Sequence, residues 1–168
     1  MEFLELAADR YSCRAFRAEP VGQADLDRIL MAARLAPTAH NNQPQEIIVV
    51  RSEEGLSRLE KCTVCHYHAP LALIVCYDKS KAWVRDYDGR SSGDVDASIV
   101  ATHMLLEAKS LGIDSVWIMY FIPEAVKTEF ELPDGVEPVA ILYMGCASEG
   151  AAPAHSERRA MDEYVTYR

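Results

Sequence analysis

The sequence predicts a single α+β domain in which helices flank one central β-sheet. Apolar runs of strand length alternate along the chain with segments of helical periodicity, and this is the pattern of a sheet covered by helices. The chain has 168 residues, which fits one domain and is too short for two ordinary ones. Its composition, 49% hydrophobic and 26% charged, can supply a core without disulfides or a metal. We therefore expect residues 1–168 to form one domain.

Three helices and one strand are expected in the first part of the chain. In the second of these helices Leu26, Ile29 and Leu30 recur at helical spacing, and Pro37 ends it. Residues 10–16 lose this spacing and are expected to be extended. The expected helices are residues 2–9, 23–35 and 53–61, and a fully apolar strand is expected at residues 47–50.

The longest expected helix, residues 94–111, lies in the second part of the chain. Two acids occupy its positive end, and Gly112 closes it. Its apolar side chains cover more than one stripe, and a helix that is apolar nearly all round must be covered nearly all round. In a small domain a partner subunit is the natural cover. The other expected elements are strands at residues 71–77, 115–119 and 139–144 and a helix at residues 123–130.

Two segments lack regular patterning. Residues 79–93 are charged, aromatic and irregular, so they are a candidate for a mobile or substrate-facing insertion. After Gly145 the chain is rich in small residues and then polar, with Met161, Tyr164 and Val165 as its apolar anchors. These anchors are too few to pack alone. We predict that the segment from about residue 147 reaches over a second subunit.

Charge and cysteine content restrict the partners and the compartment. A net charge of −9 argues against nucleic acid or an anionic membrane as the main partner, because both require a basic surface. Residues 1–6 lack the features of a signal peptide, and the longest apolar run, residues 69–77, is about half a membrane span. Five cysteines, an odd number, suggest reduced thiols. We expect a cytoplasmic protein that binds neither membrane nor nucleic acid.

The first candidate site is Arg10-Tyr11-Ser12-Cys13-Arg14. In an extended chain alternate side chains share a face, so Arg10, Ser12 and Arg14 would point the same way. Two guanidinium groups and a hydroxyl on one face suit phosphate oxygens. The alternative is a surface stretch whose arginines pair with Glu5, Asp9 and Glu19.

A polar loop, residues 36–44, is the second candidate. A helix stopped by proline and followed by amides and a hydroxyl presents hydrogen-bond donors and acceptors from a rigid bend. Such groups suit the polar edge of a heteroaromatic ring. The alternative is a helix cap and a turn whose Asn and Pro residues serve the backbone.

Cys62, Cys65, His66 and His68 form the third candidate. The spacing Cys-x-x-Cys-His is that of covalent haem attachment, and the four side chains could also hold zinc. A redox dithiol is a further possibility. The alternative, which we prefer, is that the spacing arose by chance. The segment would then be two small thiols and two imidazoles before a buried strand. We therefore assign no metal ligand.

Taken together and in order, five segments resemble the nitroreductase family of flavoproteins. The likeness covers essentially the whole chain. The segments are Arg10-x-Ser12-x-Arg14-x-Phe16, Ala36-Pro37-Thr38-x-x-Asn41-x-Gln43-Pro44, Asp96-Ala97 through Leu111-Gly112-Ile113 with Trp117-Ile118, Glu137-Pro138-Val139-Ala140 through Gly145, and Arg158-Arg159 before Met161.

The resemblance implies a three-layer fold, with a central mixed sheet of four to five strands flanked by helices, in an intertwined homodimer with two FMN molecules at its interface. By position, the segment with Tyr11 would hold the phosphate and ribityl end, helped by one of two later arginines. The loop after the second helix would reach the flavin of the other subunit, and the backbone of one strand end would line the ring. The implied residues are Arg10, Ser12 and Arg14, then Arg158 or Arg159, then Pro37, Thr38, Ala39 and Asn41, and then Trp117 and Ile118.

The sequence departs from the family pattern in three places. Gln45 stands where many members have Trp, and Met119-Tyr120-Phe121 stand where many have glycines. Bulky groups there would reshape the space beside the flavin. Residues 83–90, from Trp83 to Arg90, resemble a subfamily feature without an assigned role.

The function implied is reduction of nitro compounds, quinones or similar electron-poor substrates by NADH or NADPH, through FMN, with ping-pong kinetics. No side chain need be a nucleophile or a general base, so we predict no catalytic residue. Other acceptors stay open: enones, halogenated phenols or free flavin. So do a non-enzymatic FMN-binding module and a haem or zinc protein built on Cys62, Cys65 and His66.

Overall fold

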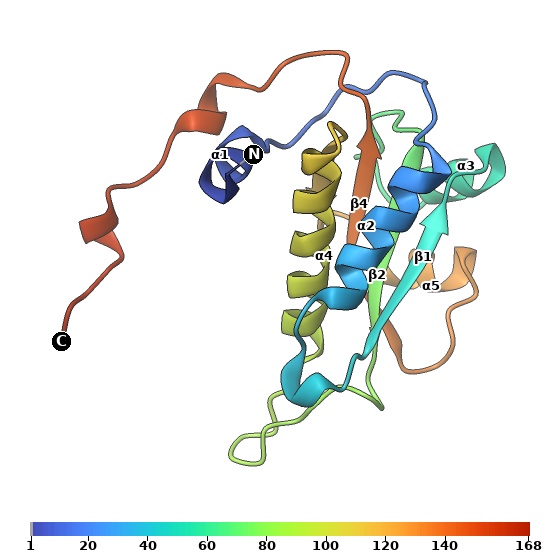
Figure 1. Ribbon diagram of the computed structural model, residues 1–168. Helices are drawn as coiled ribbons and strands as arrows, with labels where there is room; N and C mark the ends of the chain where they lie inside the picture. The colour runs from blue at the N-terminus through green and yellow to red at the C-terminus, as the bar shows by residue number, and fades with distance from the viewer. Residues whose placement is uncertain (1) are drawn as a thin grey trace.

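A four-stranded sheet forms the middle of the structure, a computed structural model that describes residues 2–168 apart from the side chains at positions 153 and 154 (Figure 1). Its strand order is β1-β2-β4-β3. All four strands were expected from their apolar runs, and each is confirmed with slightly different ends. The strands are β1 (Gln45–Val50), β2 (Leu71–Asp78), β3 (Asp114–Ile118) and β4 (Val136–Gly145).

The expectation of a mixed sheet is wrong for these four strands. All three neighbouring pairs are antiparallel. β2 and β3, which the longest helix joins, are both antiparallel to β4 and therefore run parallel to each other, but β4 lies between them. The one parallel pairing among residues 2–168 is a single bridge between Ser12 and Ser115.

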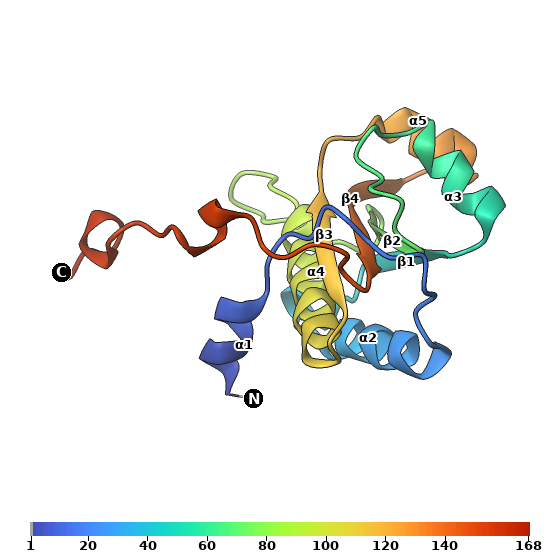
Figure 2. The same ribbon diagram turned by 90° about the horizontal axis from the view of Figure 1, so that it is seen from above.

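Helices cover both faces of the sheet and complete three layers. α2 (Gln23–Leu35) and α4 (Gly93–Ser110) lie on one face, and α3 (Glu53–Glu60) and α5 (Pro123–Glu129) lie on the other (Figure 2). α1 (Phe3–Asp9) packs beside α4. The three-layer arrangement is thereby confirmed.

Each face of the sheet has its own apolar core. β2 is buried along nearly its whole length because both faces are covered. On one side α4 packs Ala97, Val100 and Met104 onto the sheet, and their spacing of three to four residues places them on one helix face. Gly93 begins this helix, and a Cβ there would lie 2.1 Å from the ring of Tyr77. The first turn of α4 therefore approaches β2 more closely than any larger residue would allow.

The outer face of α4 has no cover within residues 2–168. A shallow groove of about 420 Å³ follows it, and Val95 at its beginning is 48% exposed. The sequence predicts that this helix is covered on nearly all sides. That a partner subunit covers this face stays a prediction. The groove is lined by Asp94, Val95, Ser98, Ile99, Thr102 and His103.

The C-terminal segment leaves the folded body (Figures 1 and 2). It first follows the N-terminal extended segment, where the Ser148 N–H donates to the Ala15 carbonyl at 2.9 Å. Farther on, two of its three apolar anchors are solvent-exposed, Met161 by 67% and Tyr164 by 57%. A segment that extends from the domain with exposed apolar side chains is consistent with the prediction that it packs against a second subunit.

Crossing a membrane needs a helix that is both long and apolar, and none of the helices within residues 2–168 meets both conditions.

Candidate functional site

Residues 10–16 run extended beside the edge strand β3, as expected. The Cys13 N–H donates to the Ser115 carbonyl at 2.9 Å, and Ser12 pairs with Ser115. The Cys13 side chain is buried, with 1% exposed. Because side chains alternate along an extended chain, its neighbours Ser12 and Arg14 face the opposite side.

A polar cavity of about 260 Å³ opens on that side. It brings together the three residues that the alternation predicted and adds Arg158 from the C-terminal segment. Arg159 lies elsewhere, with its guanidinium 5.4 Å from the ring centre of Tyr164. Of the two arginines left open by the sequence, Arg158 is thus the one that reaches the cavity. Its lining is Arg10, Tyr11, Ser12, Arg14, Ala152, His155 and Arg158.

The arginines of this cavity lack carboxylate partners. Asp9 pairs with Lys109 at 2.9 Å, and Glu19 pairs with Arg17 at 3.7 Å. Glu5 accepts a hydrogen bond from the backbone of Glu2 at 3.2 Å. Among residues 2–168 neither Arg10 nor Arg14 makes an ion pair, so the alternative of surface arginines paired with these acids is not supported. Uncompensated guanidinium groups around one polar cavity in an acidic protein provide the charge and the donors that an anion-binding site requires.

The polar loop after α2 is held by a buried carboxylate. Asp96, which is 2% exposed in the first turn of α4, accepts from the Ala39 N–H at 2.9 Å and from the Ser92 hydroxyl at 2.7 Å. Within the loop, Thr38 Oγ1 accepts from the Gln43 N–H at 3.0 Å. These contacts fix a bend that ordinary backbone preferences resist.

Three loop residues have left-handed backbone conformations, with φ of 53° at His40, 56° at Asn41 and 51° at Gln43. Each such non-glycine residue costs about 1–3 kcal/mol and persists where its surroundings enforce it. His40 stacks on Trp83, with ring centroids 5.2 Å apart and planes at 16°. Trp83 therefore supports this loop, a role that the sequence did not assign to it. Strained backbone of this kind is common at ligand-binding sites.

The loop and the arginine cavity lie at opposite ends of α4 (Figure 1). Ala39 contacts Asp96 near its beginning, whereas Lys109 near its end lies 5.4 Å from the ring centre of Tyr11. At a rise of about 1.5 Å per residue, these two points are roughly 20 Å apart. One chain therefore does not assemble both groups in one cavity.

The outer edge of β3 is the third part of the predicted site. The Ser115 carbonyl points outward to Cys13, and the period of two along a strand gives the backbone groups of Trp117 the same direction. The backbone of Ile118 points inward to β4, and its side chain is buried. Trp117 therefore offers an N–H and a carbonyl at this edge, and Ile118 offers none.

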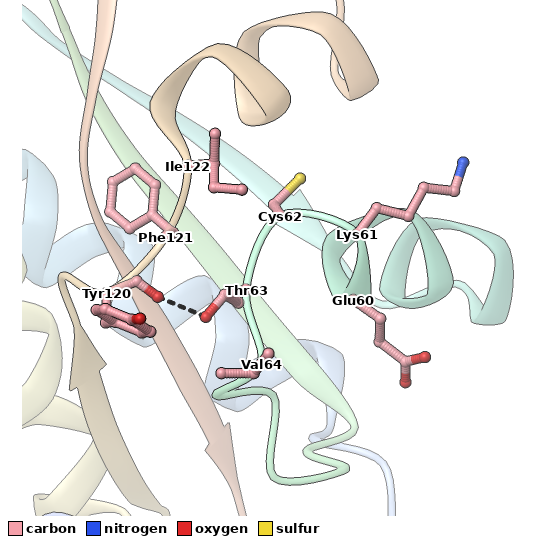
Figure 3. Close-up of a pocket in the computed structure, with 8 residues that line it drawn as sticks. All are labelled: Glu60, Lys61, Cys62, Thr63, Val64, Tyr120, Phe121 and Ile122. Atoms are coloured by element: carbon pink, nitrogen blue, oxygen red, sulfur yellow. Dashed lines mark hydrogen bonds between the residues drawn. The ribbon is translucent and has the colours of Figure 1, made fainter.

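An apolar cavity of about 310 Å³ lies beyond the end of β3 (Figure 3). The Thr63 hydroxyl donates to the Tyr120 carbonyl at 2.6 Å, and the Ile122 N–H donates to the Cys62 carbonyl at 2.9 Å. These bonds join the loop after α3 to the turn before α5. The bulky residues Tyr120 and Phe121, noted as a departure from the family pattern, form part of its wall.

The Cys62 and Cys65 thiols do not form the metal site that their spacing suggested. Cys62 is buried, and its sulfur donates to the Arg58 carbonyl at 3.5 Å. Burial raises the pKa of the Cys62 thiol, which favours the protonated form over the thiolate that binds metals and attacks disulfides. In the part of the chain that the structure describes, neither thiol belongs to a group of side chains spaced as metal ligands.

Comparison with known proteins assigns this chain to a family. The model of the nitroreductase family matches residues 7–67 and 65–146. The chain belongs to the nitroreductase family. This confirms the family predicted from the five sequence segments.

Relatives of known structure share the whole fold. A nitroreductase family protein from Clostridium difficile 630 is 45% identical, with a TM-score of 0.95 over 99% of this chain and 98% of its own. An FMN-dependent nitroreductase from Clostridium difficile R20291 is 27% identical, with a TM-score of 0.81 over 98% of both chains. In sequence, the chain is also similar to the FMN reductase [NAD(P)H] of Bacillus subtilis, with 28% identity over 99% of this chain and 74% of that protein.

Sequence reasoning missed two residues of the site. In the sequence Asp96 is only one of two acids at the positive end of the longest helix, and the fold shows it buried under the polar loop. His155 lines the arginine cavity, and its Nε2 lies 2.9 Å from the Ala8 carbonyl oxygen. No pattern in a polar C-terminal segment identifies such a residue, because its contact is made 147 positions away along the chain.

Replacing Asp96 by alanine is expected to loosen the loop that carries Ala39. The Ala39 N–H loses its acceptor, and an unsatisfied buried donor costs about 1–3 kcal/mol. Denaturant unfolding of the variant should show a loss of this size. Glu53→Ala, which removes an exposed acid from the first turn of α3, should lose no more than about 1 kcal/mol, since only an interaction with the helix dipole disappears. Equal losses in both variants would contradict the anchoring role.

Proposed function

We propose that this chain is an FMN-dependent oxidoreductase that uses NADH or NADPH to reduce electron-poor substrates such as nitro compounds and quinones. The observation that carries the proposal is the polar cavity in which Arg10, Ser12, Arg14 and Arg158 converge without carboxylate partners. Membership of the nitroreductase family and relatives named FMN-dependent nitroreductase and FMN reductase support it.

The residues present fit the cofactor. Planar guanidinium groups form paired hydrogen bonds with phosphate oxygens, so Arg10, Arg14 and Arg158 would hold the phosphate and Ser12 would add a hydroxyl. The outward N–H and carbonyl of Trp117 match the donors and acceptors along one edge of the flavin ring. Bound FMN supplies hydride transfer, while the protein supplies binding, orientation and electrostatics.

The second half of each site would come from a partner subunit. Pro37, Thr38, Ala39 and Asn41 belong to a loop roughly 20 Å from the arginine cavity of the same chain, so a second copy must bring the two together. The uncovered groove on α4 and the exposed anchors Met161 and Tyr164 support such a homodimer. The strained loop would then be held in its binding conformation by Asp96 and Trp83 before any ligand arrives.

During turnover the protein itself would bind the cofactor and keep water away from it. The arginines would fix the phosphate end, and the loop held by Asp96 would limit access of water to the ring. We propose no side chain as nucleophile, general acid or general base. We expect ping-pong kinetics, because nicotinamide and acceptor would occupy the same place in turn. Free flavin is a second candidate acceptor, favoured by the relative named FMN reductase.

Anaerobic addition of NADH or NADPH to the flavin-loaded protein tests this function. The yellow absorption of the oxidised flavin should bleach and should return when a nitroaromatic compound, a quinone or free flavin is added. Parallel lines in double-reciprocal plots would show the ping-pong order. A bound flavin that neither nicotinamide bleaches would instead indicate a non-enzymatic FMN-binding module.

A further inference from the structure

Three side chains with metal-binding chemistry meet between α3 and β2, apart from the arginine cavity. Glu60 is the last residue of α3, and His66 and His68 follow in the loop that leads to β2. One possible ligand atom from each lies within 4.8 Å of the other two. Figure 3 shows the Glu60 carboxylate directed away from the Lys61 ammonium group.

The geometry of the cluster is close to that of a coordination sphere. His66 Nδ1 lies 3.7 Å from Glu60 Oε1, and the two imidazole rings meet edge to face with centroids 4.7 Å apart. Zinc binds nitrogen and oxygen at about 2.0–2.2 Å, and tetrahedral angles place two such ligands about 3.4 Å apart. The ligand atoms lie within 4.8 Å of one another, so they would have to close by up to about 1.4 Å, and Glu60 and His68 are exposed side chains that can rotate to do so.

One nitrogen of the cluster lacks a hydrogen-bond partner among residues 2–168. His66 Nδ1 is buried and makes no hydrogen bond within residues 2–168. Buried polar atoms without partners are rare in folded proteins and call for an explanation. A metal ion between His66, His68 and Glu60 would satisfy this nitrogen.

The surroundings leave room for a further ligand. His66 and His68 line a cavity of about 440 Å³, where a water molecule or a small anion could occupy the fourth position. Arg14 lines the same cavity and would favour an anion there. Two imidazoles and one carboxylate suit Zn²⁺, Ni²⁺ or Co²⁺ and not Mg²⁺ or Ca²⁺, which prefer oxygen ligands throughout.

We propose that Glu60, His66 and His68 form a binding site for a divalent transition-metal ion of the zinc type. Its three ligands line no part of the arginine cavity, and the site uses neither Cys62 nor Cys65. Its ion would tie the end of α3 to the loop that leads to β2. The same loop contains Thr63 and Val64, which line the apolar cavity beyond β3. The ion would therefore also restrict the motion of this part of the cavity wall.

Calorimetric titration of Zn²⁺ into the untagged, chelator-treated, flavin-loaded protein tests the proposal. We expect one ion per chain, and Co²⁺ should give the visible spectrum of a site with nitrogen and oxygen ligands. His66→Ala and His68→Ala should each weaken binding by more than about 100-fold, since loss of even an outer-shell partner costs 10–100-fold. Glu60→Gln should weaken it as well.

Matched variants separate this site from other sources of metal binding. Glu53→Gln on α3 should leave the affinity for Zn²⁺ unchanged, and so should Cys65→Ser. Circular dichroism of the apo variants checks that each is folded. The proposal is overturned if the protein takes up no Zn²⁺, if uptake survives the His66→Ala/His68→Ala double substitution, or if Cys65→Ser abolishes it.

Discussion

Replacing both Arg10 and Arg14 by alanine is expected to release FMN from the protein. Each charged hydrogen bond to phosphate contributes about 1.5–3 kcal/mol, so two together raise the dissociation constant by roughly 10²–10⁴-fold. Neither arginine has a carboxylate partner among residues 2–168, so the substitutions leave no acid unpaired. Titration of the apoprotein with FMN, followed by flavin fluorescence, measures the change.

The Arg34→Ala/Arg51→Ala variant is the matched control. It lowers the positive charge by the same amount on exposed arginines outside the cavity, and its affinity for FMN should be close to that of the unaltered protein. Arg10→Lys/Arg14→Lys should fall in between, because lysine keeps the charge and loses the planar fork. Full retention of flavin by the alanine variant would refute the phosphate role of these arginines.

Introducing glutamate at Val95 is expected to separate the proposed dimer. The side chain is 48% exposed in the single chain, and an acid near the beginning of α4 suits the helix dipole, so the fold itself should tolerate it. Buried in an apolar interface, an unpaired carboxylate costs several kcal/mol. The dimer dissociation constant should therefore rise by about 10³-fold or more, and flavin should be lost with the dimer. Analytical ultracentrifugation measures the first effect and absorbance the second.

Val49→Glu provides the comparison for this variant. Val49 is a half-exposed valine on the edge strand β1, away from the groove on α4. We expect that variant to stay dimeric and yellow. The groove on α4 is not the interface if the Val95→Glu protein sediments like the unaltered protein and keeps its flavin.

Local patterns predicted the elements well because each depends on a short stretch of sequence. The helix at residues 23–35 has the observed bounds of α2, and the alternation around Ser12 placed Arg10 and Arg14 in one cavity. These inferences need only the period of a helix or a strand and a stop signal such as Pro37.

The features that the sequence did not reveal depend on contacts between distant residues. The position of β4 between β2 and β3 follows from packing of the whole chain, so the purely antiparallel pairing was not foreseen. The burial of Asp96 depends on a loop 57 positions earlier in the chain. His66 and His68 were considered together with two cysteines, but the fold turns Cys62 into the core and brings Glu60 to the imidazoles instead.

Mixing two defective proteins tests most directly whether one flavin site is built from two subunits. One protein carries Arg10→Ala/Arg14→Ala and the other Thr38→Ala/Asn41→Ala, and each alone should bind little FMN. After joint unfolding and refolding, every mixed dimer has one site with intact arginines from one chain and an intact loop from the other. We predict that the mixture regains flavin and reductase activity, with one FMN per mixed dimer. A mixture that binds no more FMN than its separate components would contradict the shared site.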